Sequence, residues 1–72
     1  MNLKERFGKT VRRLREKAGY SQEGFADRAK VHRTYMGTVE RGETNLTLEN
    51  IEKLARALDL KMWQLFKELE DG

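Results

Sequence analysis

Residues 21–42 have the sequence SQEGFADRAKVHRTYMGTVERG, which predicts two short helices joined by a tight turn. Ser21 is a favourable N-cap for the first helix and Gly42 is a favourable stop for the second, while Lys30 and Val31 form the turn. The second helix has an apolar face that can anchor it and a polar face that can donate, accept or touch a methyl group. The anchors are Met36 and Val39, and the polar face carries Arg33, Thr34, Tyr35 and Thr38.

Apolar residues on both sides of this stretch recur at helical spacing and predict three further helices. The first helix ends near Gly19, the fourth runs from a Thr47 cap to about Leu58, and the short fifth covers residues 62–69. Their apolar stripes are Leu3, Phe7, Val11, Leu14 and Ala18, then Leu48, Ile51, Leu54, Ala55 and Leu58, then Met62, Leu65, Phe66 and Leu69. Because no Pro interrupts these helices, we expect a single all-α domain of five helices over residues 1–72.

The composition limits what this domain can bind. The chain has 72 residues, no Cys and one His, so it can form neither a disulfide nor a metal site built from several Cys or His, and we expect no cofactor. Small domains often need stabilisation from disulfides, a metal ion or oligomerisation, and oligomerisation is the source that remains for this chain. No apolar run approaches the roughly 18 residues of a membrane span, and the charged N-terminus is not a signal peptide, so we expect a cytoplasmic protein without membrane contact.

The net charge of +3 conceals an asymmetry along the chain. Residues 1–20 carry seven Lys or Arg against two Glu, whereas residues 42–72 carry four Lys or Arg against seven Asp or Glu. A basic face suits a polyanion, although an ordinary solvated helix surface gives the same pattern. The charge therefore indicates nucleic-acid binding only in combination with a motif.

The motif resembles a known family. The segments SQEGFA and VHRTYMGTVERG, followed by NLTLENIEKLARAL and LF, resemble the helix-turn-helix proteins of the phage-repressor type, often called Xre-like, over about residues 5–67. The run RTYMG followed by VERG resembles the controller proteins of restriction–modification systems, which are small dimeric regulators. This resemblance implies a lambda-repressor-like fold with the helix-turn-helix in the second and third helices. It also implies a homodimer that binds double-stranded DNA at a palindromic operator, and contacts RNA polymerase if it activates transcription.

The resemblance also assigns roles to individual residues. Those facing base edges are His32, Arg33, Thr34 and Thr38, and those approaching phosphates are Gln22, Tyr35, Arg41 and Asn45. Arg15 and Glu40 match a buried ion pair between the first and third helices. Each of these DNA contacts has an alternative explanation. Tyr35 can be a half-buried structural residue and His32 can serve only as the cap of its helix, while the others can be ordinary surface residues.

Three positions depart from the pattern of the family, and a fourth, Gly37, is unfavourable in a helix. Lys30 occupies a turn position that usually holds Gly, so a left-handed backbone there is mildly strained, and His32 replaces the usual Asp, Ser or Thr cap. Trp63 stands where a polar residue is common. Gly37 weakens the middle of its helix but removes a side chain where another surface can approach closely.

The sequence of the fifth helix predicts a second interaction surface. A domain this small cannot easily bury every apolar residue near its C-terminus, and an exposed apolar cluster marks an interface. We therefore expect Met62, Trp63 and Leu65 to form a homodimer interface through the fourth and fifth helices. The alternative is that they only cap the core of the monomer.

The sequence carries no catalytic constellation, so we do not expect an enzyme. Ser21 is the only Ser and has no paired His, while acidic pairs such as Glu68 and Glu70 suit a solvated surface. Two other hypotheses stay open beside the DNA-binding regulator. One is a protein-interaction adaptor that uses the same fold without reading DNA, and the other is an antitoxin-type repressor.

Overall fold

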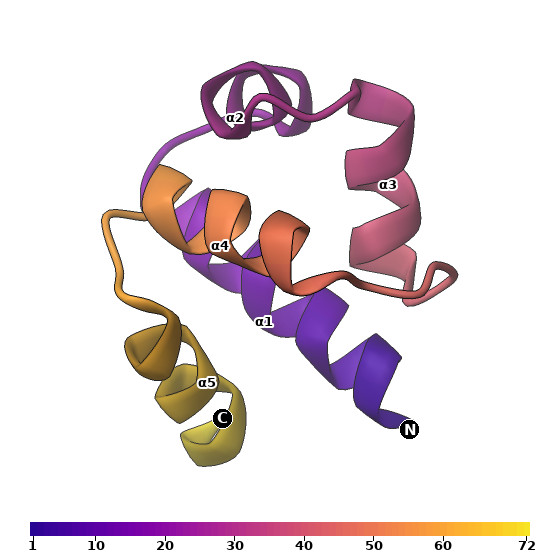
Figure 1. The fold of residues 1–72 in the computed structure, drawn as a ribbon, viewed down its shortest axis with the longest axis vertical. Helices are drawn as coiled ribbons and strands as arrows, with labels where there is room; N and C mark the ends of the chain where they lie inside the picture. Colours follow the sequence, from indigo (N-terminus) through magenta and orange to yellow (C-terminus); the bar gives the residue numbers. More distant parts are fainter.

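The structure is a computed structural model that describes residues 1–72 and contains five helices and no strand. They are α1 (Leu3–Lys17), α2 (Gln22–Ala29), α3 (Arg33–Arg41), α4 (Leu48–Ala57) and α5 (Met62–Asp71). In Figure 1, α1 crosses the molecule diagonally, α2 lies at the top, α3 runs down the right-hand side and α5 lies at the lower left. The all-α fold with five helices predicted from the sequence is confirmed.

Polar side chains at the predicted positions cap the N-termini of α2 and α4. The hydroxyls of Ser21 and Thr47 accept hydrogen bonds from the backbone N–H groups of Gly24 and Asn50, at 3.0 and 3.1 Å. The start of α1 has a capping box that the sequence analysis missed, in which Asn2 and Glu5 each accept the other's backbone N–H. These caps satisfy N–H groups that have no partner inside the helix.

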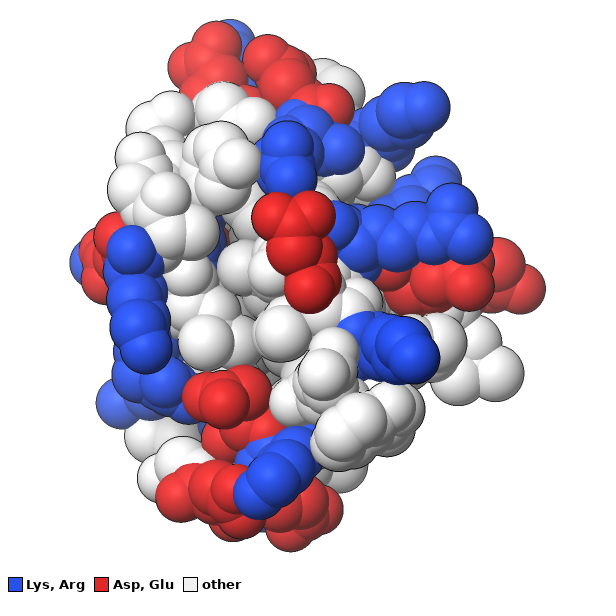
Figure 2. Space-filling model, turned by 90° about the vertical axis from the view of Figure 1, so that its left-hand side faces the viewer, with Lys and Arg blue, Asp and Glu red and all other residues white.

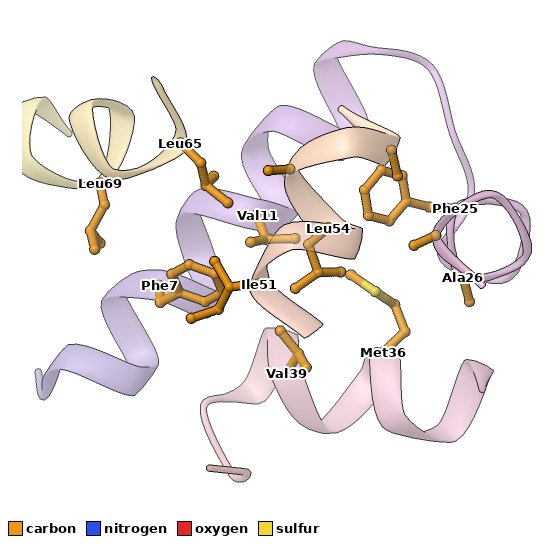
Figure 3. Close-up of a cluster of buried hydrophobic side chains, with 13 residues drawn as sticks. Phe7, Val11, Phe25, Ala26, Met36, Val39, Ile51, Leu54, Leu65 and Leu69 are labelled. Carbon is orange, nitrogen blue, oxygen red and sulfur yellow. The ribbon is translucent and has the colours of Figure 1, made fainter. Parts of the chain in front are cut away.

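One core of thirteen buried apolar residues joins all five helices. Figure 3 shows Phe7 and Val11 of α1 facing Ile51 and Leu54 of α4, with Met36 of α3 beside them. Within this core α1 packs against α3 and α5, while α4 packs against α2 and α5. The core therefore supports α3 from one side only and leaves its other side open.

Five apolar residues lie differently from the expectation. Four of them belong to the predicted stripes but are exposed, namely Leu3, Ala18, Leu48 and Phe66. Leu3 and Leu48 are the first residues of their helices and Ala18 follows the last residue of α1, so these three lie beyond the core. Leu65 has no exposed surface, since it lies on the core face of α5 with Leu69. The prediction that Leu65 belongs to an exposed dimer interface was therefore wrong.

Two left-handed residues set the ends of the helices in the motif. Lys30 follows α2 with φ 60° and ψ 41°, as expected from its turn position, and Gly42 follows α3 with φ 72° and ψ 28°. A side chain in this conformation costs about 1 kcal/mol at Lys30. Gly42 avoids that cost and also gives room to α1, because a Cβ atom there would lie 2.7 Å from the Glu5 Cα atom.

Helices α1 and α3 approach each other closely at Gly8 of α1. A Cβ atom at Gly8 would clash with the carbonyl oxygen of Val39 and lie 2.7 Å from that of Glu40. Both obstacles are backbone atoms of α3, which cannot move aside as a flexible side chain can. The absence of a side chain at Gly8 therefore determines how closely α3 lies against α1.

We predict that Gly8→Ala destabilises the fold, although Ala is the better helix former. Overpacking costs about 1–3 kcal/mol, and here the backbone of α3 must shift as well. The free energy of unfolding, measured by urea denaturation followed by circular dichroism, should fall by at least that amount. Lys9→Ala, at the adjacent exposed position, is the control and should change it by less than about 0.5 kcal/mol. Equal stability of the two variants would contradict the close approach.

Candidate nucleic-acid interface

Helix α3 presents two different faces. Met36 and Val39 are buried in the core, while Arg33 and Thr34 are exposed on the opposite face. Thr38 lies one turn after Thr34 and is half-buried, and its hydroxyl donates a hydrogen bond to the Tyr35 carbonyl at 2.7 Å. An external partner can thus use the methyl group and the oxygen lone pairs of Thr38, but not its hydroxyl proton.

His32 begins this helix with an uncommon cap. Its backbone is extended, with φ −69° and ψ 143°, and its Nδ1 atom accepts the backbone N–H of Thr34 at 3.0 Å. The cap leaves Nε2 as the free ring nitrogen of an exposed side chain. His32 is therefore a cap residue and can still contact a neighbouring molecule.

Arg33 is paired with an acidic residue across the motif. Its Nη1 atom lies 3.3 Å from Oε2 of Glu23 in the first turn of α2, and both side chains are about two-thirds exposed. An exposed pair of this kind contributes less than about 1 kcal/mol. Arg33 can thus exchange Glu23 for a stronger acceptor at little cost.

Tyr35 is held by a residue that the sequence analysis did not select. Its hydroxyl accepts a hydrogen bond of 3.1 Å from Nδ2 of Asn50, which lies in the first turn of α4. The Tyr35 ring packs against the core, so the hydroxyl is fixed at the edge of α3. No sequence signal identified Asn50, because the contact joins side chains of two helices that are 15 positions apart in the chain.

Arg15 and Glu40 form the buried ion pair expected from the resemblance. Arg15 donates from Nε and Nη2 to the two carboxylate oxygens at 2.7 and 3.1 Å, and the two side chains are only 9% and 4% exposed. Nη1 of Arg15 also donates to the Tyr20 carbonyl at 2.8 Å. The hydrogen bond to Glu40 is the main reason that the pKa of Arg15 is raised above its ordinary value, and burial opposes it.

The same carboxylate positions Gln22. Oε1 of Glu40 accepts a hydrogen bond of 3.1 Å from Nε2 of Gln22, the first residue of α2. An amide nitrogen carries two hydrogens, so one remains for an external acceptor. The pair of Arg15 and Glu40 thereby fixes a side chain at the surface as well as the angle between α1 and α3.

The remaining predicted contacts lie at the end of α3. Arg41 is exposed and its Nε atom donates to Glu43 at 2.9 Å, while Asn45 in the following loop accepts a hydrogen bond of 3.3 Å from Lys4. Arg41 lines one hollow together with Gln22, Arg33 and Thr34, whereas Asn45 faces α1 and lines a different hollow with Leu3, Lys4 and Phe7. The structure therefore brings predicted polar residues of α2 and α3 onto connected surface, but it does not place Asn45 there.

An apolar surface lies along α4 and α5. Trp63 is 61% exposed and Phe66 is 37% exposed, and since they are one turn apart they share one face of α5. Met62 is half-buried beside them, and Leu48 and Leu3 are exposed at the starts of their helices. A groove of about 450 Å³ between α1, α4 and α5 is lined by Leu3, Lys4, Phe7, Asn45, Leu46, Ile51, Phe66 and Leu69.

Figure 2 shows the side of the molecule that faces away from α3. Acidic and basic side chains are intermixed on this side and uncharged surface lies between them, so no single sign of charge dominates.

No group of three or more His, Cys, Asp or Glu is arranged to hold a metal ion. None of the five helices combines the length and the apolar character needed to cross a membrane.

Comparison with known proteins places this surface in context. A family model described as a helix-turn-helix domain matches residues 6–62. The control protein C.MunI from Mycoplasma sp is 39% identical over 70 residues, which cover 96% of this chain and 95% of the relative. The control protein C.BamHI from Bacillus amyloliquefaciens is 43% identical over 61 residues, which cover 83% and 75%.

The chain belongs to the helix-turn-helix family of control proteins. Its structure is similar to the crystal structure of the restriction–modification controller protein C.AhdI from Aeromonas hydrophila, with a TM-score of 0.82. That match is 47% identical in sequence and covers 86% of this chain and 94% of the other. The resemblance recognised from the RTYMG and VERG runs is confirmed, and the relatives named here are regulators and not enzymes.

We predict that the buried ion pair of this helix-turn-helix domain stabilises it only as a pair. Arg15→Met leaves the Glu40 carboxylate buried without its partner and should cost about 3–5 kcal/mol, whereas Arg15→Met combined with Glu40→Leu should recover most of the loss. Urea denaturation at neutral pH measures both. Because the pKa of Arg15 is raised, its contribution is complete at neutral pH, where the Glu40 carboxylate is ionised, and on the alkaline side it is lost only as the pH rises through the guanidinium range. A double variant as unstable as the single one would contradict this account.

Proposed function

We propose that this protein is a sequence-specific regulator of transcription that binds double-stranded DNA with helix α3 in the major groove. The observation that carries the proposal is the division of α3, which is anchored through Met36 and Val39 and exposes polar side chains on its other face. A major groove is about 12 Å wide and admits one α-helix. The family of control proteins supports the same function.

The exposed face of α3 suits the edges of bases. Arg33 can present its fork to O6 and N7 of a guanine, which is the commonest specific contact and is worth about 1–3 kcal/mol of discrimination. Thr34 and Thr38 can place methyl groups against thymine, and Nε2 of His32 is free for a base or a phosphate. These four residues are our candidates for reading sequence.

A second set of residues suits the DNA backbone. Gln22 and Tyr35 are already oriented by Glu40 and Asn50, so their remaining donors point to fixed places. Arg41 and Asn45 lie at the end of α3 and in the loop after it, where the phosphates that border the groove would lie. Such contacts set the register of the protein on the duplex and carry no sequence information by themselves.

We also propose a homodimer, with the apolar surface on α4 and α5 as its interface. Trp63, Phe66 and Met62 lie close together on α5, while Leu65 lies in the core and takes no part. Burying an exposed apolar cluster between two copies gives a small domain the stabilisation that its own core lacks. A two-fold dimer would hold two α3 helices about one DNA turn apart, on a palindromic operator.

The similarity to control proteins favours a role in a restriction–modification system. The solved relative is described as a restriction–modification controller protein, and we infer that this chain likewise controls genes of such a system. Binding at a promoter would block RNA polymerase or recruit it, depending on where the operator lies. The protein would act in the cytoplasm, where its DNA is.

Selection of bound duplexes from a random DNA pool at near-physiological salt tests this function. We expect a two-fold symmetric motif with half-site centres about one helical turn apart. An asymmetric motif would support sequence-specific DNA binding but contradict the two-fold symmetric dimer. No enrichment would overturn the function and favour a protein-interaction adaptor with the same fold.

Arg33→Ala should remove discrimination at one base pair of each half-site and leave the others unchanged. Affinity for the selected duplex should fall about tenfold or more, because one bidentate contact is lost in each half-site. Arg12→Ala is the matched control, since it removes the same charge from the exposed face of α1. Competition binding against duplexes changed at single positions measures the effect. A loss of equal size on every sequence would assign Arg33 to a phosphate instead.

Trp63→Glu should convert the dimer to a monomer, because a carboxylate cannot be buried between two apolar surfaces without a partner. Sedimentation equilibrium should show half the mass, and affinity for the full operator should fall with it. Lys17→Glu, on exposed surface of α1, should leave the mass unchanged. An unchanged mass for Trp63→Glu would place the interface elsewhere.

A further inference from the structure

The two ring nitrogens of His32 have different surroundings. Nδ1 accepts the backbone N–H of Thr34 at 3.0 Å, while Nε2 has no hydrogen-bond partner in the chain. The side chain is exposed and directly precedes Arg33, the first residue of α3. In helix-turn-helix proteins the N-terminal residues of the recognition helix contact base edges. Nε2 is therefore the polar atom that His32 can offer to a bound duplex.

The cap determines where the proton of the neutral ring lies. The backbone N–H of Thr34 is always a donor, so the ring atom that faces it must have a free lone pair. A neutral imidazole carries its proton on one of the two nitrogens. Because Nδ1 is the acceptor, the proton lies on Nε2. The other tautomer would place an N–H group of the ring against the N–H group of Thr34 and lose the cap.

A good cap does not by itself require His. Ser, Thr, Asp and Asn are the preferred N-caps because a side-chain oxygen accepts the same kind of N–H group. Ser21 and Thr47 cap α2 and α4 of this chain in that way. His32 differs from them in having a second nitrogen, which the cap does not use and which carries a proton. The uncommon cap thus supplies a hydrogen-bond donor at the start of α3.

The four bases differ in whether they can accept from such a donor. In the major groove guanine presents N7 and O6, adenine presents N7 and thymine presents O4, and all of these atoms are acceptors. Cytosine presents only its N4 amino group, which is a donor. An Nε2–H group can therefore bond to three of the four bases, whereas at cytosine it meets another donor. The opposite tautomer would accept a hydrogen bond from cytosine instead.

We propose that the cap between His32 and Thr34 fixes the imidazole as a donor, and that His32 thereby disfavours cytosine at one position of each half-site. The proposal rests on the proposed function, and it names the base edges that this residue accepts. His32 is then both the cap of α3 and a specificity-determining residue. The two roles are linked, because the cap is what holds the proton on Nε2.

The tautomer can be observed in the free protein. A long-range nitrogen–proton correlation spectrum of the isotope-labelled imidazole, recorded in mildly alkaline buffer, shows which nitrogen carries the proton. Since His32 is the only His in the chain, its signals need no further assignment. We expect the proton on Nε2. A proton on Nδ1, or equal populations of the two tautomers, would overturn the proposal.

His32→Ser tests the donor, because Ser is also a favourable cap but lacks the second nitrogen. Affinities are measured for the duplex found by selection and for duplexes that carry each of the four bases at single positions. At one position of each half-site, cytosine should weaken binding of the native protein by about three- to tenfold, the range expected for one neutral hydrogen bond. His32→Ser should remove this penalty without lowering the melting temperature.

His32→Ala is the matched control for the cap, since it loses both the cap and the donor. Its melting temperature should fall by about 4–8 °C, while its base preference should equal that of His32→Ser. If His32→Ser still disfavours cytosine at that position, the cap alone carries the preference and the proposal is wrong. An equal loss of affinity on every sequence would assign His32 to a phosphate and also overturn it.

Failure of this proposal can be distinguished from failure of the proposed function. A native protein that selects a duplex, but shows no penalty against cytosine at any position that His32→Ser affects, overturns only the proposal about His32. A native protein that selects no duplex overturns the proposed function, and the reading of bases by His32 fails with it.

Discussion

The position of α3 depends on its contact with α1. At nine residues, α3 is too short to be stable by itself in water, so the surface against which it packs determines where it points. Gly8 allows the backbones of the two helices to approach, and the fork of Arg15 fixes their angle by holding both oxygens of Glu40. Because Glu40 also holds Gln22, one buried carboxylate links α1, α2 and α3.

The turns restrict α3 further. Lys30 and Gly42 are both left-handed, and their N–H groups bond to the last turns of α2 and α3, so neither junction can lengthen or unwind without losing hydrogen bonds. The cost at Lys30 is small compared with the loss of the packing that this turn makes possible. A short helix between two fixed turns keeps its side chains in place, which recognition of DNA requires.

Local signals in the sequence predicted much of this arrangement, and contacts between distant residues account for what was missed. The caps at Ser21 and Thr47, the turn at Lys30 and the division of α3 follow from residue type and spacing. The hydrogen bond from Asn50 to Tyr35, and that from Arg28 to the Ala57 carbonyl at 2.7 Å, depend on crossing angles that spacing does not encode. Leu65 was misplaced for a related reason, because the apolar stripe of α5 is wide and only the packed structure shows which part of it faces the core.

The polar residues around α3 fall into two groups that differ in how firmly they are held. Gln22 and Tyr35 are bound by half-buried or buried partners, so their positions are set before any ligand arrives. Arg33 and Arg41 are bound by exposed carboxylates, and such pairs are weak and screened by salt. Fixed neutral donors can set the register on a DNA backbone, whereas exchangeable cations can leave their carboxylates for whichever base or phosphate lies within reach. The same surface can therefore be rigid where it must align the duplex and adaptable where it must test the sequence.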